Sequence, residues 1–74
     1  MKTVFIADKV ADDCVTMLQQ SGFNVINKPG LEIPEKLEII ANADALIVRS
    51  ATKVDAEMFA AAPNLKVVGR AGTG

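Results

Sequence analysis

Four short runs of apolar, mostly β-forming residues recur along this chain and constrain its fold more than any other feature. They occupy residues 3–7, 23–27, 44–48 and a last run that begins at Leu65. Their apolar centres are continuous rather than alternating, which is typical of parallel strands covered on both faces. The second run is more polar than the others, which favours a position near a sheet edge. The pattern therefore predicts a parallel sheet.

The segments between these runs show helical spacing. Helices are predicted at about residues 12–21, 33–41 and 56–62. In the first helix, Cys14, Met17 and Leu18 fall on one apolar stripe, so we expect Cys14 to pack against the sheet rather than to react. Asp55 precedes the third helix and is a suitable N-cap residue.

The element order β-α-β-α-β-α-β, with short connections, predicts an α/β fold with right-handed crossovers. We expect a flavodoxin-like doubly wound sheet in strand order 2-1-3-4. The first helix should then cover one face and the other two helices the opposite face. Because the first face is left under-covered, we expect the fold to be truncated before a fifth strand. Residues 1–74 would then be the N-terminal part of a larger domain.

Composition limits the possible partners and compartments. The chain has 74 residues, enough for one small domain, and a net charge of −1 with scattered cations. We therefore expect neither nucleic-acid nor membrane-surface binding. No apolar run reaches the roughly 18–20 residues that span a bilayer. The single cysteine excludes an internal disulfide and fits a reducing cytoplasm, and the absence of histidine excludes a His-based metal site.

Ligands of such sheets bind beyond the carboxyl ends of the strands, and Arg49 and Ser50 directly follow the third run. A guanidinium there is suited to hold a carboxylate or phosphate, with the Ser50 hydroxyl beside it. The alternative is structural: Arg49 caps the sheet edge or pairs with a carboxylate such as Asp8.

The fourth run leads into Gly69-Arg70-Ala71-Gly72-Thr73-Gly74. Glycines allow a ligand to approach main-chain N–H groups, and Arg70 adds a cation, so the loop is suited to bind an anion. The alternative is a plain tight turn between a strand and a helix. The spacing G-x-x-G-x-G differs from the dinucleotide fingerprint G-x-G-x-x-G, so we do not interpret it as a cofactor site.

Two of these segments together resemble a known family. The stretch LIVRSATKV at residues 46–54 and the stretch VVGRAGTG at residues 67–74 are similar to the substrate domain of the D-3-phosphoglycerate dehydrogenases, within the wider D-2-hydroxyacid dehydrogenase family. The spacing between the two stretches and the opening residues 5–8 fit the same template. The resemblance covers essentially the whole chain, and an arginine in both stretches favours the phosphoglycerate enzymes.

The resemblance implies NAD-dependent oxidation of 3-phosphoglycerate to 3-phosphohydroxypyruvate in L-serine biosynthesis, by an enzyme that is a homo-oligomer. It implies that Arg49, Ser50 and Arg70 bind the substrate, and that the amides of Ala71, Gly72 and Thr73 face its carboxylate. Thr73 would also approach the nicotinamide. The family's catalytic residues and its nucleotide fingerprint fall beyond Gly74, so we expect no catalytic residue in this chain, no activity from it alone, and a cofactor-binding domain outside it.

Two alternatives remain beside this interpretation. One is another D-2-hydroxyacid dehydrogenase, such as a hydroxypyruvate or glyoxylate reductase, because either stretch alone indicates only the wider family. The other is a small-anion-binding module without catalytic activity.

Overall fold

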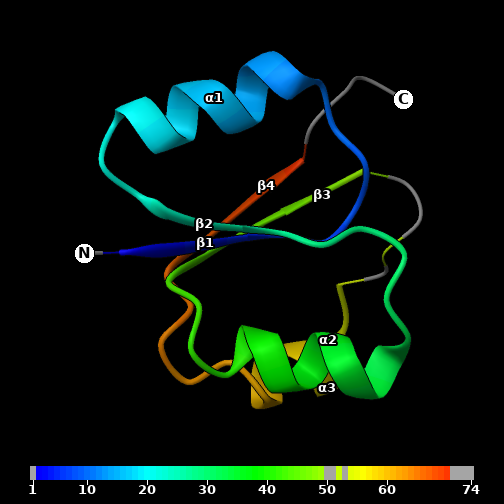
Figure 1. The fold of residues 1–74 in the computed structure, drawn as a ribbon. Coiled ribbons are helices and arrows are strands. Elements are labelled where there is room, and N and C mark those ends of the chain that lie inside the picture. Colours follow the sequence, from blue (N-terminus) through cyan, green and yellow to red (C-terminus); the bar gives the residue numbers. More distant parts are fainter. Residues whose placement is uncertain (1, 50–51, 53, 71–74) are drawn as a thin grey trace.

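The computed structural model describes residues 2–49, 52 and 54–70 (Figure 1). Its strands and helices alternate along the chain in the predicted order. They are β1 (Thr3–Ile6), α1 (Asp12–Gln20), β2 (Asn24–Asn27), α2 (Ile33–Ile40), β3 (Ala45–Val48), α3 (Ala56–Ala60) and β4 (Val67–Arg70).

The four strands form one parallel sheet in the order β2-β1-β3-β4, which confirms the predicted topology. Helix α1 lies over one face of the sheet, and α2 and α3 lie together over the other (Figure 1). In the central pair Phe5 is opposite Leu46, and at the far end of the sheet Val48 is opposite Arg70. All four strands therefore end at one edge, the edge at which ligands of such sheets bind.

Local sequence signals explain where several elements begin and end. The carboxylate of Asp55 accepts a hydrogen bond from the Met58 N–H at 3.1 Å, which confirms the predicted N-cap of α3. Gly22 follows α1 with a φ of 91°, a conformation that glycine adopts without strain. The strands and helices are one or two residues shorter than predicted, because element ends are the least regular part of each pattern.

The hydrophobic core lies between the sheet and the α2/α3 layer. Alternate strand residues point into it, among them Phe5, Leu46 and Val48, and they meet Ile40 of α2 and Met58 of α3. All five side chains are buried. This face of the sheet is closed over β1 and β3, whereas Val68 of β4, opposite Leu46, is 38% exposed.

The face beneath α1 is open by comparison. None of the residues of α1, all of which the structure describes, is buried, and Met17 is 65% exposed. The predicted apolar stripe is therefore wrong for Met17, because the half-buried side of α1 is formed by Cys14, Val15 and Leu18 instead. Cys14 is only half-buried.

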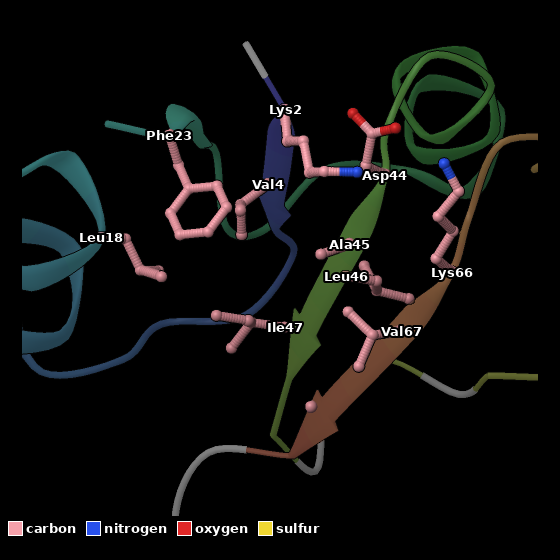
Figure 2. Close-up of a pocket in the computed structure, with 11 residues that line it drawn as sticks. Lys2, Val4, Leu18, Phe23, Asp44, Ala45, Leu46, Ile47, Lys66 and Val67 are labelled. Carbon is pink, nitrogen blue, oxygen red and sulfur yellow. The ribbon is translucent and has the colours of Figure 1, made fainter. Parts of the chain in front are cut away.

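A groove of about 410 Å³ lies on this open face, beside α1 (Figure 2). Leu18 and Phe23 border one side, and Val4, Ile47 and Val67 of the sheet form its floor. The side chains at its charged end are those of Lys2, Asp44 and Lys66.

At this amino end of the sheet, Asp44 joins β1 to β3 and β4. Its carboxylate accepts a hydrogen bond from the Thr3 N–H at 2.8 Å. Its own N–H donates to the Thr3 carbonyl, and its carbonyl accepts from the Lys66 N–H, each at 2.8 Å. The starts of three strands are thus held together around one residue.

Candidate functional site

Two arginines stand at the carboxyl edge of the sheet, on neighbouring strands. Arg70 is the last residue of β4 and lies opposite Val48, and Arg49 follows Val48 directly. Neighbouring strands are about 4.8 Å apart, so the two main-chain positions are close. Both side chains are exposed. The edge therefore presents two exposed guanidinium groups on neighbouring strands.

The side chain of Arg49 extends over the end of β1. Its Nη1 donates to the Lys9 carbonyl at 3.4 Å, a long and exposed hydrogen bond. Such a bond is weak, so an incoming carboxylate or phosphate could displace it at small cost. The guanidinium has five N–H donors, and the remaining ones make no hydrogen bond to the described residues.

Asp8 lies beneath Arg49 and binds its main chain. One carboxylate oxygen of Asp8 accepts from the Arg49 N–H at 2.6 Å and from the Thr52 N–H at 3.0 Å. The other oxygen accepts a short hydrogen bond from the Thr52 hydroxyl. Asp8 is 4% exposed. Within the described part of the chain, no buried side-chain nitrogen or oxygen lacks a hydrogen-bond partner.

These bonds keep the Asp8 carboxylate ionised. Burial by itself would raise the pKa of Asp8, but the hydrogen bonds from the Thr52 hydroxyl, the Arg49 N–H and the Thr52 N–H, and the nearby Lys36 charge, lower it. The result is a pKa below the ordinary aspartate value. Donors directed at the charged form thus outweigh its desolvation.

Lys36 of α2 completes the cluster. Its Nζ donates to the Thr52 hydroxyl at 3.0 Å, and that hydroxyl in turn donates to Asp8. We refer to Asp8, Lys36 and Thr52 as the Asp8 cluster. It connects the end of β1, helix α2 and the segment that follows β3.

The Asp8 cluster corrects one expectation from the sequence. Asp8 was considered as a charge partner for the Arg49 side chain, but it contacts the Arg49 main chain instead. The parts played by Thr52 and Lys36 were missed altogether. A buried aspartate at a strand end was the available signal, because such a carboxylate needs donors.

The other predicted site residues fall outside the described residues. They are Ser50, Ala71, Gly72 and Thr73. Gly69 is described and lies within β4 without a positive φ. A Cβ built there would lie 3.9 Å from the Ile47 Cγ1, an ordinary contact, so this position does not require glycine.

The described residues contain neither a metal-ligand cluster nor a membrane-spanning helix. In the described ranges 2–49, 52 and 54–70, no three histidine, cysteine, aspartate or glutamate side chains gather as metal ligands would. None of the helices found there has the length and apolar character to cross a bilayer.

Comparisons with known proteins agree on the family. The model for the D-isomer specific 2-hydroxyacid dehydrogenase catalytic domain matches residues 4–74. Proteins named D-3-phosphoglycerate dehydrogenase are similar over the whole chain: that of Mycobacterium bovis is 47% identical over 75 residues and that of Homo sapiens 43% over 74. That of Archaeoglobus fulgidus is 38% identical over 71 residues, 96% of this chain. The chain spans 14% of the length of each of these relatives.

A solved structure gives the same result for the fold. The crystal structure of the TT0316 protein from Thermus thermophilus matches with a TM-score of 0.78 and 26% sequence identity, over 92% of this chain and 22% of that one. The resemblance read from residues 46–54 and 67–74 is thereby confirmed. With a family model that matches nearly every residue, and with relatives over its full length, this chain belongs to the D-isomer specific 2-hydroxyacid dehydrogenase family.

Proposed function

We propose that this chain provides the substrate-binding edge of an NAD-dependent dehydrogenase that oxidises 3-phosphoglycerate to 3-phosphohydroxypyruvate. The relatives' name supports this substrate. The observation that carries the proposal is the pair of exposed arginines at neighbouring strand ends, Arg49 and Arg70. 3-Phosphoglycerate has a phosphate and a carboxylate, and a guanidinium binds either with two parallel hydrogen bonds.

The remaining contacts follow from the family resemblance. Ser50 would add a hydroxyl beside Arg49, and the amides of Ala71, Gly72 and Thr73 would face the substrate carboxylate. These residues bind and orient the substrate. We assign no proton or hydride transfer to any residue of this chain.

NAD does not fit the residues at hand. The glycine spacing at residues 69–74 is not that of a dinucleotide fingerprint, and its first glycine, Gly69, lies inside β4 rather than after it. We therefore propose that the cofactor is bound by a separate domain and that Thr73 is this chain's contribution near the nicotinamide. We further propose that the enzyme is a cytoplasmic homo-oligomer that serves L-serine biosynthesis.

The test is the substitution Arg49→Ala in the protein as its gene encodes it. A hydrogen bond to a charged group contributes about 1.5–3 kcal/mol, and about 1.4 kcal/mol is tenfold in an equilibrium constant. We expect kcat/KM for 3-phosphoglycerate to fall roughly 10- to 150-fold. Arg49→Lys should restore only part of it, because an ammonium group lacks the planar fork. NADH affinity, measured by fluorescence titration, should stay nearly unchanged.

Lys28→Ala is the matched control. Lys28 is also an exposed cation directly after a strand at this edge, but it follows β2, two strands away from β3. Its removal should leave kcat/KM nearly unchanged. An equal loss in both variants would reduce the role of Arg49 to general charge attraction, and no loss in Arg49→Ala would reject it as a substrate ligand.

The alternatives give different results in the same assay. A hydroxypyruvate or glyoxylate reductase would prefer those substrates to the phosphorylated one. A non-catalytic module would bind 3-phosphoglycerate without any change in NADH absorbance.

A further inference from the structure

In the described structure, the carboxylate of Asp8 accepts three hydrogen bonds from Arg49 and Thr52. Substrate binding as proposed above assigns no role to the Asp8 cluster. We infer that Asp8, together with Thr52, is a positioning residue for Arg49. By this inference Asp8 fixes the direction in which the guanidinium leaves the sheet. The inference rests on the proposed role of Arg49 in substrate binding.

The geometry supports this role directly. A single oxygen of Asp8 accepts from the N–H groups of Arg49 and Thr52, at 2.6 and 3.0 Å. The carboxylate therefore holds the main chain at Arg49, the proposed ligand, and again at Thr52. Asp8 directly follows the end of β1, the strand that lies next to β3 in the sheet. The position of Arg49 is therefore set relative to β1.

Thr52 connects this point to the closed side of the sheet. Its side chain is buried, and its hydroxyl accepts from Lys36 of α2 while donating to Asp8. Thr52 is thus held by Asp8, which follows β1, and by Lys36 of α2. By contrast, the Arg49 side chain makes a weak bond to the Lys9 carbonyl, and no other hydrogen bond to the residues that the structure describes. The Arg49 main chain is thus held more firmly than its side chain.

This arrangement suits an anion site for a physical reason. A ligand residue whose main chain moves freely loses conformational entropy on binding, and the bond of the Arg49 N–H to Asp8 reduces that loss. Even a small displacement of a group that holds the substrate lowers the reaction rate substantially. Asp8 itself does not contact the substrate: it is buried, and its two oxygens are occupied by Arg49 and Thr52.

The experiment compares Asp8→Ala with Asp8→Asn in the protein as its gene encodes it. Asp8→Ala removes every bond of the carboxylate, and we expect kcat/KM for 3-phosphoglycerate to fall roughly tenfold or more. Asp8→Asn keeps one carbonyl oxygen that can accept from both N–H groups, so it should restore a large part of the loss. Should Asp8→Ala not fold, Thr52→Val, which removes only the hydroxyl, takes its place against Thr52→Ser.

Asp44→Ala is the matched control. The Asp44 carboxylate accepts from a main-chain N–H, that of Thr3, between the same two strands but at the opposite end of the sheet. Its loss should lower stability without lowering kcat/KM. Equal losses of kcat/KM in Asp8→Ala and Asp44→Ala would show that Asp8 acts only through stability and would overturn the inference.

A double-mutant cycle with Arg49→Ala separates positioning from stability. If Asp8 acts through Arg49, then Asp8→Ala in the Arg49→Ala background should change kcat/KM by less than about twofold, because contacting residues are not additive. A loss as large as in the wild-type background would overturn the inference.

Hydrogen exchange gives a readout that does not depend on turnover. In the peptide that contains Arg49 and Thr52, two amides should exchange at least about tenfold faster in Asp8→Ala than in Asp44→Ala, because their acceptor is gone. Unchanged exchange overturns the inference for any substrate. Faster exchange in a protein that does not turn over 3-phosphoglycerate would retain Asp8 as the holder of the segment and reject the proposed function.

Discussion

The two faces of the sheet differ in how they are closed, although the same four strands supply both. Beneath α2 and α3, the buried side chains of Phe5, Leu46 and Val48 form one core cluster with helical residues. Beneath α1, the floor of the sheet lines an open groove, and Val67 is 58% exposed. One face holds the main core, whereas the other is an apolar surface with less cover.

This difference bears on how firmly the chain holds each of its two proposed substrate ligands. The Asp8 cluster lies on the closed side, because Lys36 belongs to α2. Arg49 therefore leaves the sheet from a main chain whose N–H is bonded to Asp8. Arg70 ends β4, an edge strand that has only β3 beside it. The two proposed substrate ligands thus differ in the support behind them.

Among the substitutions that test this comparison, Leu46→Ala is expected to lower the free energy of unfolding the most. Leu46 is fully buried on the closed face, and such a substitution costs about 2–5 kcal/mol through lost transfer energy and an unfilled cavity. The free energy of unfolding, measured by urea denaturation, should fall by that amount.

A pair of identical substitutions sharpens the comparison. Val48 and Val67 lie on neighbouring strands but on opposite faces, and they are 2% and 58% exposed. Val48→Ala should cost about 1.5–3 kcal/mol, the value of a buried valine, and Val67→Ala less than about 1 kcal/mol. An equal cost at both positions would mean that something covers the groove, and the contrast between the faces would fail.

A smaller effect is expected from acid. Because the folded-state pKa of Asp8 is below the ordinary value, its contribution to stability is fully present above about pH 4, the pKa of an unfolded aspartate. That contribution is lost as the pH falls from there through the folded pKa. The difference in unfolding free energy between the wild type and Asp8→Asn should therefore shrink below about pH 4. Urea titrations from about pH 3 to 7 measure it, and a difference independent of pH would contradict the role of the charge.

The smallest effect is expected at Cys14, on the inner side of α1. The thiol is half-buried, so Cys14→Ala should cost about 1 kcal/mol or less and leave kcat/KM within about twofold. A thiol reagent should label the native protein at a measurable rate. Complete resistance to labelling before unfolding would show that the α1 face is as closed as the other.

Much of the fold was predictable because its signals are local. Continuous apolar runs marked the strands, their alternation with helical spacing indicated the order 2-1-3-4, and Asp55 marked the start of α3. The sheet-end positions of Arg49 and Arg70 followed from the same pattern.

The remainder depends on contacts between distant residues. Asp8 and Thr52 are 44 positions apart. One of the hydrogen bonds between them comes from a main-chain N–H, a group that every residue except proline has. No residue pattern marks such a bond. The exposure of Met17 also escaped prediction, because helical spacing indicates an apolar stripe but not how much sheet lies beneath it.

The carboxylates of Asp8 and Asp44 have a consequence for how β1 finds β3 during folding. At one end Thr3 donates to Asp44 and at the other Arg49 donates to Asp8, and each bond joins residues 41 positions apart. Closing the chain between such distant residues costs conformational entropy only once, because the first bond to form brings the second pair together. A slip of one residue would turn every apolar side chain to the wrong face. A slip of two residues would keep the faces, so hydrophobic pattern alone cannot reject it, but it would separate both carboxylates from their amides and leave Asp8 buried without donors.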